Sequence, residues 1–276
     1  MRFTGGIFDV DGVLLDTPHA QAWREALAQL MAGPWHALAP GTSYRPGAFT
    51  DAVYQDYVAG KPRKAGAAAA LNYFHVRDSD GSLARQYGDV KQAILERLAA
   101  AGAFRAYDDA LRFLLQVKAS GVRVCAASSS KNADAFLKGI SVGAFCSNEG
   151  LHYPFVHAQI TLLDLFDANV DGLDVPRGKP DPALFLAAAR ALGMAPGQCF
   201  VVEDAGVGIQ AAKSGGMYGI GVARHQDGDD LRVAGADIVV ERLDTVDVQA
   251  LVGDVSAGLS PTQETRATDR HMGQPG

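Results

Sequence analysis

The sequence predicts an α/β protein: a doubly wound, Rossmann-like parallel sheet as the core, with an inserted α-helical cap domain. Two observations predict this fold class. Short apolar runs without polar alternation recur along the chain and are separated by helix-like segments, as expected for strands buried on both faces of a parallel sheet. Between about residues 17 and 102 this alternation stops, and four helical patterns follow one another. A helical block placed after the first strand predicts a second domain over the sheet.

The expected elements follow in chain order. Apolar runs predict core strands at 6–10, 122–127, 199–202, 219–223 and 237–240. Apolar residues at three-to-four spacing predict core helices within 108–120, 182–193 and 208–216, and cap helices within 19–33, 49–60, 62–74 and 82–102. We therefore expect a core of residues 1–16 and 103–254, a cap of residues 17–102, and a disordered polar tail at 255–276.

The composition excludes several functional classes. A formal net charge of -6 is unsuited to a protein that binds nucleic acid or a membrane surface. No apolar run approaches the ~18 residues of a membrane-spanning helix. The three cysteines, Cys125, Cys146 and Cys199, form no CxxC pair, so neither zinc nor a structural disulfide is expected. We expect a cytoplasmic protein that is a monomer or a weak homodimer.

The most informative segment is GGIFDVDGVLLDT at the first strand. Asp9 and Asp11 are two residues apart at the strand end, so both side chains can face one pocket beyond the carboxyl ends of the strands. Gly12 allows a sharp turn there. One carboxylate can attack phosphorus while the other gives and takes a proton. The alternative is a solvated turn, since DxDG also occurs in loops and calcium sites.

Two further segments supply groups that suit phosphate. AASSSKN places Ser128 at the end of the second strand, where hydroxyl and main-chain N–H groups can hold phosphate oxygens. The same serines could instead cap the helix that follows. RGKPDPALF places Lys179 before Pro180, where it can neutralise an aspartate and a transferring phosphoryl group. The alternative for Lys179 is an ordinary solvated loop residue.

CFVVEDAGVG places Glu203 and Asp204 at the end of another buried strand, where Mg²⁺ with its preference for oxygen ligands fits. The alternative is a helix N-terminus with favourable acids. The residues from Gly206 to Ala211 also satisfy the GxGxxA dinucleotide pattern. Because the two acids directly before them would repel a pyrophosphate, we do not expect nucleotide binding.

Together, DVDGVLLDT, SSSKN, GKPDP and VVEDAGVGIQAAKSGG resemble the four motifs of the haloacid dehalogenase superfamily, in its phosphatase and phosphomutase branch. The resemblance covers about residues 5–245. It implies that Asp9 is the nucleophile that forms an aspartyl-phosphate, and that Asp11 is the general acid and base. Ser128 and Lys179 are implied to hold the transferring phosphoryl group. The implied Mg²⁺ ligands are Asp9, the main-chain carbonyl of Asp11, and Asp204, with Glu203 close by.

Within the superfamily the sequence is most similar to β-phosphoglucomutase. That resemblance implies a phosphate grip formed by Ser130, Lys131 and Asn132, and substrate contacts from His19, Trp23 and Arg63 of the cap. Each cap residue has an alternative. Trp23 could be core packing, His19 could lie on the surface, and Arg63 could belong to a solvated basic face with Lys61 and Lys64.

The resemblance implies an Mg²⁺-dependent enzyme acting on hexose phosphates, with a phosphatase of sugar or other small phosphate monoesters as the alternative. A non-catalytic sugar-phosphate-binding protein is a third, remote possibility. Three features depart from the mutase pattern: the short spacing from Asp16-Thr17 to His19, the Tyr107-Asp108-Asp109 sequence at the second crossing, and the long segment 143–163. That segment could be a substrate-side loop, a dimer contact or an insertion without a function.

Overall fold

The computed structural model describes residues 3–253; the expected tail at 255–276 lies outside this range. Its core is a six-stranded parallel sheet in the order β5-β4-β1-β6-β7-β8. The first strand, β1 (Gly5–Phe8), lies between β4 (Arg123–Ala126) and β6 (Cys199–Glu203). β7 (Tyr218–Val222) and β8 (Ile238–Val240) extend the sheet on one side, and the two-residue β5 (Ala168–Asn169) on the other.

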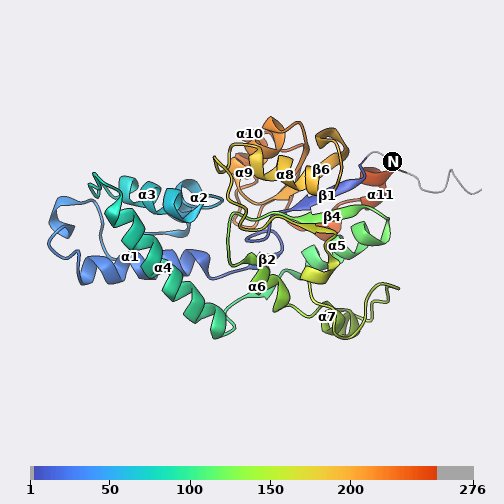
Figure 1. Ribbon diagram of the computed structural model, residues 1–276, viewed down its shortest axis with the longest axis horizontal. Helices are drawn as coiled ribbons and strands as arrows, with labels where there is room; N and C mark the ends of the chain where they lie inside the picture. The colour runs from blue at the N-terminus through green and yellow to red at the C-terminus, as the bar shows by residue number, and fades with distance from the viewer. Residues whose placement is uncertain (1–2, 254–276) are drawn as a thin grey trace, which may run out of the picture.

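Helices cover both faces of this sheet, and alternate residues of β1 show how. Ile7 packs into a cluster with residues of α8 (Ala183–Ala191) and α9 (Gly206–Ser214). Phe8 belongs to the main core, where its ring lies 6.0 Å from that of Phe113 in α5 (Asp108–Ala119). Figure 1 shows α8 and α9 on one side of the sheet and α5 on the other. Burial on both faces explains why the strand sequences are uniformly apolar.

The cap consists of α1 (His19–Ala32), α2 (Asp51–Tyr57), α3 (Arg63–Tyr73) and α4 (Ser82–Ala100). Helix α4 packs against both α1 and α3, and the cap lies to one side of the core (Figure 1). Two short strands, β2 (Leu15–Asp16) and β3 (Arg105–Ala106), pair antiparallel where the chain enters and leaves the cap. The predicted doubly wound sheet with a helical cap is confirmed; the exact boundaries at 17 and 102 stay a prediction.

The smaller helices complete the core. They are α6 (Ala133–Lys138), α7 (Val142–Glu149), α10 (Gly228–Val233) and α11 (Val248–Val252). Within residues 3–253 no helix is both long and apolar enough to cross a membrane. The cysteines Cys125, Cys146 and Cys199 are all buried free thiols, in agreement with the expected absence of a disulfide.

The long segment 143–163 packs on the core, away from the cap (Figure 1). Its helix α7 carries Glu149, which forms an ion pair with Arg112 of α5 at 2.5 Å. The main chain of Gly143 fits so closely that an added Cβ would lie 2.5 Å from the carbonyl oxygens of His157 and Ala158. None of the segment's residues lines the cavity between cap and core, so the structure does not support a substrate-side loop.

Candidate active site

Three of the four motif segments meet at the carboxyl edge of the sheet because their strands, β1, β4 and β6, are neighbours. Asp9 follows β1, Ser128 follows β4, and Glu203 is the last residue of β6. The Asp9 N–H donates to the carbonyl of Val202 at 3.0 Å, which continues the β1–β6 ladder one residue beyond the strand. The backbone that carries Asp9 is therefore fixed by the sheet itself.

Lys179 lies between two carboxylates of this edge. Its Nζ is 2.6 Å from Asp9 Oδ1 and also forms an ion pair with Glu203 Oε1. Only 4% of the Lys179 surface is exposed, so these charges face each other out of water. The Lys179–Pro180 peptide bond is cis. The expected pairing of Lys179 with an aspartate is present, and the solvated-loop alternative does not describe this residue.

Asp11 lies at the entrance to the cap. Its Oδ1 accepts a hydrogen bond from Thr17 Oγ1 at 2.8 Å and lies 3.5 Å from His19 Nε2. Its Oδ2 accepts from Ser128 Oγ at 3.3 Å. This carboxylate therefore touches the chain on both sides of the domain crossing, where it can respond to the position of the cap.

Glu203 and Asp204 have different surroundings. Glu203 Oε2 accepts the N–H groups of Asp204 and Ala205 at 2.9 and 3.0 Å, while its other oxygen holds Lys179. The protein thus uses both oxygens of Glu203. The Asp204 carboxylate lies against Gly12: a Cβ on Gly12 would meet Asp204 Oδ2 at 1.9 Å. Glu203 ends β6 and Asp204 directly follows it, whereas helix α9 begins only at Gly206, so neither acid lies in the first turn of a helix.

The buried charges do not balance. Burial raises the pKa of Asp9 well above its ordinary value, and Glu203 and Asp11 add to this while Lys179 opposes it. Burial likewise raises the pKa of Asp204, with Glu203 and Asp9 contributing. Burial alone would lower the pKa of Lys179, but Asp9 and Glu203 together raise it. One ammonium thus faces three buried carboxylates.

This imbalance fits a divalent cation with oxygen ligands. Across residues 3–253 no group of three or more His, Cys, Asp or Glu side chains is arranged to hold a metal. The expected ligand set does not require one, because it takes two side chains, Asp9 and Asp204, and one main-chain carbonyl, that of Asp11. Glu203, already engaged at both oxygens, fits an outer position that orients Lys179.

The serine-rich turn after β4 forms a compact loop. Ser128 Oγ accepts the N–H of Ser130 at 3.0 Å, and Ser130 Oγ accepts the N–H of Asn132 at 3.2 Å. Helix α6 has Asn132 as its N-cap residue with no side-chain cap hydrogen bond, so the serines do not cap it. Asp171 stabilises the loop by accepting the Ser128 N–H at 2.6 Å. Burial raises the pKa of Asp171 to about 7.

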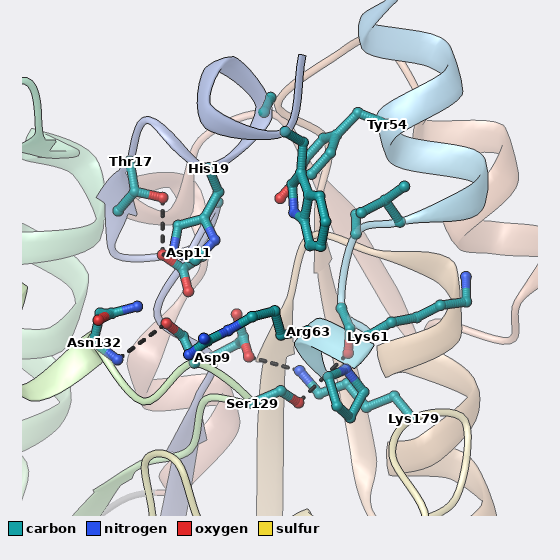
Figure 2. A pocket seen from close by; sticks show the side chains of 18 of the residues that line it. Asp9, Asp11, Thr17, His19, Tyr54, Lys61, Arg63, Ser129, Asn132 and Lys179 are labelled. Atoms are coloured by element: carbon teal, nitrogen blue, oxygen red, sulfur yellow. Dashed lines mark hydrogen bonds and ion pairs between the residues drawn. The ribbon is translucent and has the colours of Figure 1, made fainter. Parts of the chain in front are cut away.

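A cavity of about 530 Å³ opens between this edge and the cap. Figure 2 shows His19, Tyr54 and Arg63 entering it from the cap, and Asp9, Ser129 and Lys179 from the core. The other predicted substrate-binding residues that line it are Trp23, Ser130, Lys131 and Asn132. The fold therefore brings all six predicted substrate-binding residues to one cavity.

Trp23 and His19 differ in how they are held. Trp23 is 4% exposed, and its ring meets the edge of Tyr87 at a centroid distance of 4.9 Å, so it is both core packing and cavity wall. The His19 side chain is 12% exposed, but its Nε2 is buried and makes no hydrogen bond within residues 3–253. Burial lowers the pKa of His19 to about 4, with Lys91 and Arg63 contributing and Asp11 opposing. The imidazole is therefore neutral near pH 7.

Lys91 is a cavity residue that the sequence analysis missed. Its Nζ lies 3.0 Å from His19 Nδ1 and 5.2 Å from the centre of the Trp23 ring. Burial lowers the pKa of Lys91 to about 7, with Arg63 contributing and Asp11 opposing. A signal was available: Lys91 occupies the stripe of α4 that also holds Tyr87, Ile94 and Leu95, and a lysine is rarely found in such a stripe without a partner.

Two further cavity residues were also missed. Tyr54 of α2 faces the carboxylates; burial raises the pKa of its hydroxyl, and Asp11, Asp204 and Asp9 add to the effect. Gln92 of α4 exchanges hydrogen bonds of 2.8 and 3.2 Å with Asn132, which joins the cap directly to the serine-rich loop. No spacing rule relates either residue to the core motifs.

Comparisons with known proteins agree with this architecture. The model of the haloacid dehalogenase-like hydrolase family matches residues 6–216. A β-phosphoglucomutase of Mycobacterium bovis is 31% identical over 252 residues, which is 86% of this chain and 88% of that protein. A β-phosphoglucomutase of Bacillus subtilis is 34% identical over 140 residues, 51% of either chain.

A phosphatase and a solved structure are also similar. The fructose-1-phosphate phosphatase of Escherichia coli is 29% identical and aligns with 80% of this chain and 97% of its own. The crystal structure of an archaeal β-phosphoglucomutase from a Pyrococcus strain superposes with a TM-score of 0.62 at 27% identity, covering 90% of this chain and 96% of that one. The chain is therefore an enzyme of the haloacid dehalogenase-like hydrolase family, in its β-phosphoglucomutase-like branch.

Proposed function

We propose that the protein transfers phosphoryl groups of hexose phosphates through an aspartyl-phosphate on Asp9, as a β-phosphoglucomutase-like enzyme. The observation that carries this is the pairing of Asp9 with Lys179 at 2.6 Å, beside an Asp11 carboxylate that contacts Ser128 and Thr17. This chemistry needs a nucleophile paired with a cation, and a second carboxylate that can give and take a proton.

The proposed reaction has two steps, both carried out by residues of the core. In the first, Asp9 attacks phosphorus, the bond from phosphorus to the substrate oxygen breaks, and Asp11 supplies the proton to that oxygen. In the second, an acceptor oxygen attacks the aspartyl-phosphate, Asp11 takes the acceptor's proton, and the Asp9 carboxylate is released. Lys179 and Ser128 hold the phosphoryl oxygens, because a loose transition state is stabilised chiefly by positioning and charge.

Mg²⁺ is the cofactor that we propose, held by Asp9, Asp204 and the main-chain carbonyl of Asp11. When bound, it neutralises charge on the phosphoryl oxygens and orients the group that is transferred. The raised pKa values of Asp9 and Asp204 support this, since both carboxylates lack a sufficient counter-charge among the described residues.

The identity of the acceptor separates a mutase from a phosphatase. Arg63 and Lys131 line the same cavity from opposite domains, which suits a second, non-transferring phosphate. The neutral His19 imidazole lies next to Asp11, with its Nε2 3.5 Å from Asp11 Oδ1 and its Nδ1 3.0 Å from Lys91 Nζ, which is consistent with proton handling by His19. These features favour transfer to a sugar hydroxyl. The alternative, hydrolysis of a sugar phosphate or another small monoester, uses the same core and is supported by the likeness to fructose-1-phosphate phosphatase.

One experiment decides between these outcomes. The enzyme is incubated with Mg²⁺ and β-glucose 1-phosphate, with and without a hexose bisphosphate primer, and glucose 6-phosphate and inorganic phosphate are both measured. Glucose 6-phosphate that depends on the primer supports the mutase, whereas inorganic phosphate alone supports the phosphatase. Asp9→Asn is the control, and turnover undiminished in that variant would sink the assignment of the nucleophile.

Some expectations remain predictions. They are the cytoplasmic location and the monomeric or weakly dimeric state. A non-catalytic sugar-phosphate-binding protein is disfavoured by membership of an enzyme family and by the pair of carboxylates, since binding alone needs neither a nucleophile nor a proton donor.

A further inference from the structure

The two chain crossings between core and cap form a single two-stranded ribbon. Leu15 pairs with Ala106 and Asp16 with Arg105. At the core end of the ribbon the Tyr107 N–H donates to the carbonyl of Leu14 at 2.9 Å. Any change in the position of the cap must pass through this ribbon, so whatever fixes its base sets how the cap meets the active site.

Arg224, two residues after the end of β7, lies at that base. Its Nε donates to the carbonyl of Gly12 at 3.3 Å and its Nη2 to that of Val13 at 3.0 Å, both at the start of the first crossing. Its guanidinium carbon lies 3.9 Å from the centre of the Tyr107 ring, at the end of the second crossing. One side chain therefore contacts both crossings.

The core side holds this guanidinium in place. Arg224 Nη1 lies 3.1 and 2.9 Å from the two carboxylate oxygens of Asp109, the second residue of α5. Asp109 Oδ2 also accepts the N–H of Leu243 at 2.7 Å. The side chains of Arg224 and Asp109 are 8% and 6% exposed, so the pair is shielded from solvent. An arginine can fill this place because its planar fork presents several donors at once.

We propose that Arg224 is a positioning residue that holds the base of the cap ribbon and, through it, the Asp11 carboxylate. Asp11 directly precedes Gly12, one of the two residues whose carbonyls Arg224 holds. Thr17, just beyond the ribbon, donates to Asp11 at 2.8 Å. Arg224 itself does not line the substrate cavity, so it acts through this segment and not by contact with substrate.

The direct test is hydrogen exchange on the intact protein, which does not depend on activity. Arg224→Lys keeps a positive charge for Asp109 but loses the fork and the stacking on Tyr107. We expect faster exchange in residues 12–17 and 104–107, and unchanged exchange in β6 and β7. Arg112→Lys is the matched control: Arg112 pairs with Glu149 at 2.5 Å and Asp244 at 3.4 Å, outside the ribbon.

The kinetic test rests on the proposed phosphoryl transfer and compares two substrates. A hexose phosphate needs the cap, whereas acetyl phosphate is too small to contact most of it. Arg224→Lys should lower kcat/KM for the hexose phosphate by about tenfold or more, and for acetyl phosphate by about twofold at most. Arg112→Lys should not discriminate between them.

Two results would overturn the proposal. One is unchanged exchange in the ribbon in both Arg224→Lys and the double variant Arg224→Met with Asp109→Asn, which removes the pair without leaving a bare charge. The other is an equal loss on the two substrates. If the wild-type protein turned over neither substrate, the proposed function would fail, while the exchange measurement would still decide the role of Arg224.

Discussion

The Lys179 ammonium lies 2.6 Å from the Asp9 carboxylate, and the two residues are only 4% and 6% exposed. The same ammonium is the buried counter-charge of Glu203. Burying such charges costs free energy, and removing one partner costs more, because the other charge is then buried without a counter-charge. Lys179 therefore has two separable roles, one in folding and one in the proposed transfer.

Replacement of Lys179 tests both roles. Lys179→Met should lower the free energy of unfolding by about 3–5 kcal/mol, because two buried carboxylates lose their counter-charge. It should lower turnover by about 10²–10³-fold, because one stabilising cation is lost from the transition state. Urea denaturation and phosphate release measure the two effects. The control is Lys118→Met, which breaks a partly exposed pair with Asp167 and should cost about 1 kcal/mol or less. A loss no larger than the control's would contradict the assignment.

The proton donor can be identified by varying the leaving group. Asp11→Asn should reduce kcat for a sugar phosphate by about 10²–10⁴-fold, because the leaving alkoxide needs a proton. The loss should be much smaller for p-nitrophenyl phosphate, whose leaving group is stable without one. Asp16→Asn, which changes a 49% exposed partner of Arg105, is the control in the same segment. Equal losses on both substrates would show that Asp11 does not protonate the leaving group.

The sequence predicted the sheet well because its strands are buried on both faces. Runs such as 199–202 are uniformly apolar, a pattern that a surface segment does not sustain, and β1, β4, β6, β7 and β8 all lie within two residues of the expected ranges. The two-residue strands β2, β3 and β5 were not predicted. At that length no periodicity exists, and β2 and β3 form only because the two crossings meet in space.

The same distinction applies to the active site. Asp9, Ser128 and Asp204 could be placed from sequence because each lies at or just after the end of a predicted strand, and parallel strands end at a common edge. Lys91 and Arg224 could not be placed in this way. Lys91 reaches His19 only once α4 packs on α1, and Arg224 meets Gly12 across more than 200 residues of chain. Such contacts depend on tertiary packing, which leaves at most a local trace, such as a lysine in an apolar stripe.

Gly12 links backbone conformation to the carboxylate edge. It has a φ of +84°, and an added Cβ would lie 1.9 Å from Asp204 Oδ2. Gly12→Ala should therefore displace Asp204 and weaken Mg²⁺ affinity, measured by calorimetric titration. Gly47 is a matched control, since it has a φ of +82° and no atom within 4 Å of the added Cβ. Gly47→Ala should cost about 1 kcal/mol of stability from the backbone alone and leave Mg²⁺ binding unchanged. Equal binding by both variants would contradict this account.

Lys91 should make stability depend on pH in a defined direction. Burial lowers its pKa from 10.5 to about 7 in the folded protein, so the unfolded chain holds this proton more tightly across that interval. The resulting penalty is absent above pH 10.5, grows as the pH falls, and is complete below about pH 7. Lys91→Met removes it. The variant's stability relative to wild type should therefore be greater at pH 7 than at pH 10, by about 3 kcal/mol.

Urea denaturation of both proteins at several pH values measures that difference. The control is Leu95→Met, a buried substitution in the same helix that changes no titrating group, so its effect on stability should not vary with pH. A constant difference between Lys91→Met and wild type from pH 7 to pH 10 would show that Lys91 keeps its proton when buried. In that case His19 Nδ1 would accept from an ammonium, the neutral imidazole would carry its hydrogen on Nε2, and Nε2 would face Asp11 as a donor and not as a base.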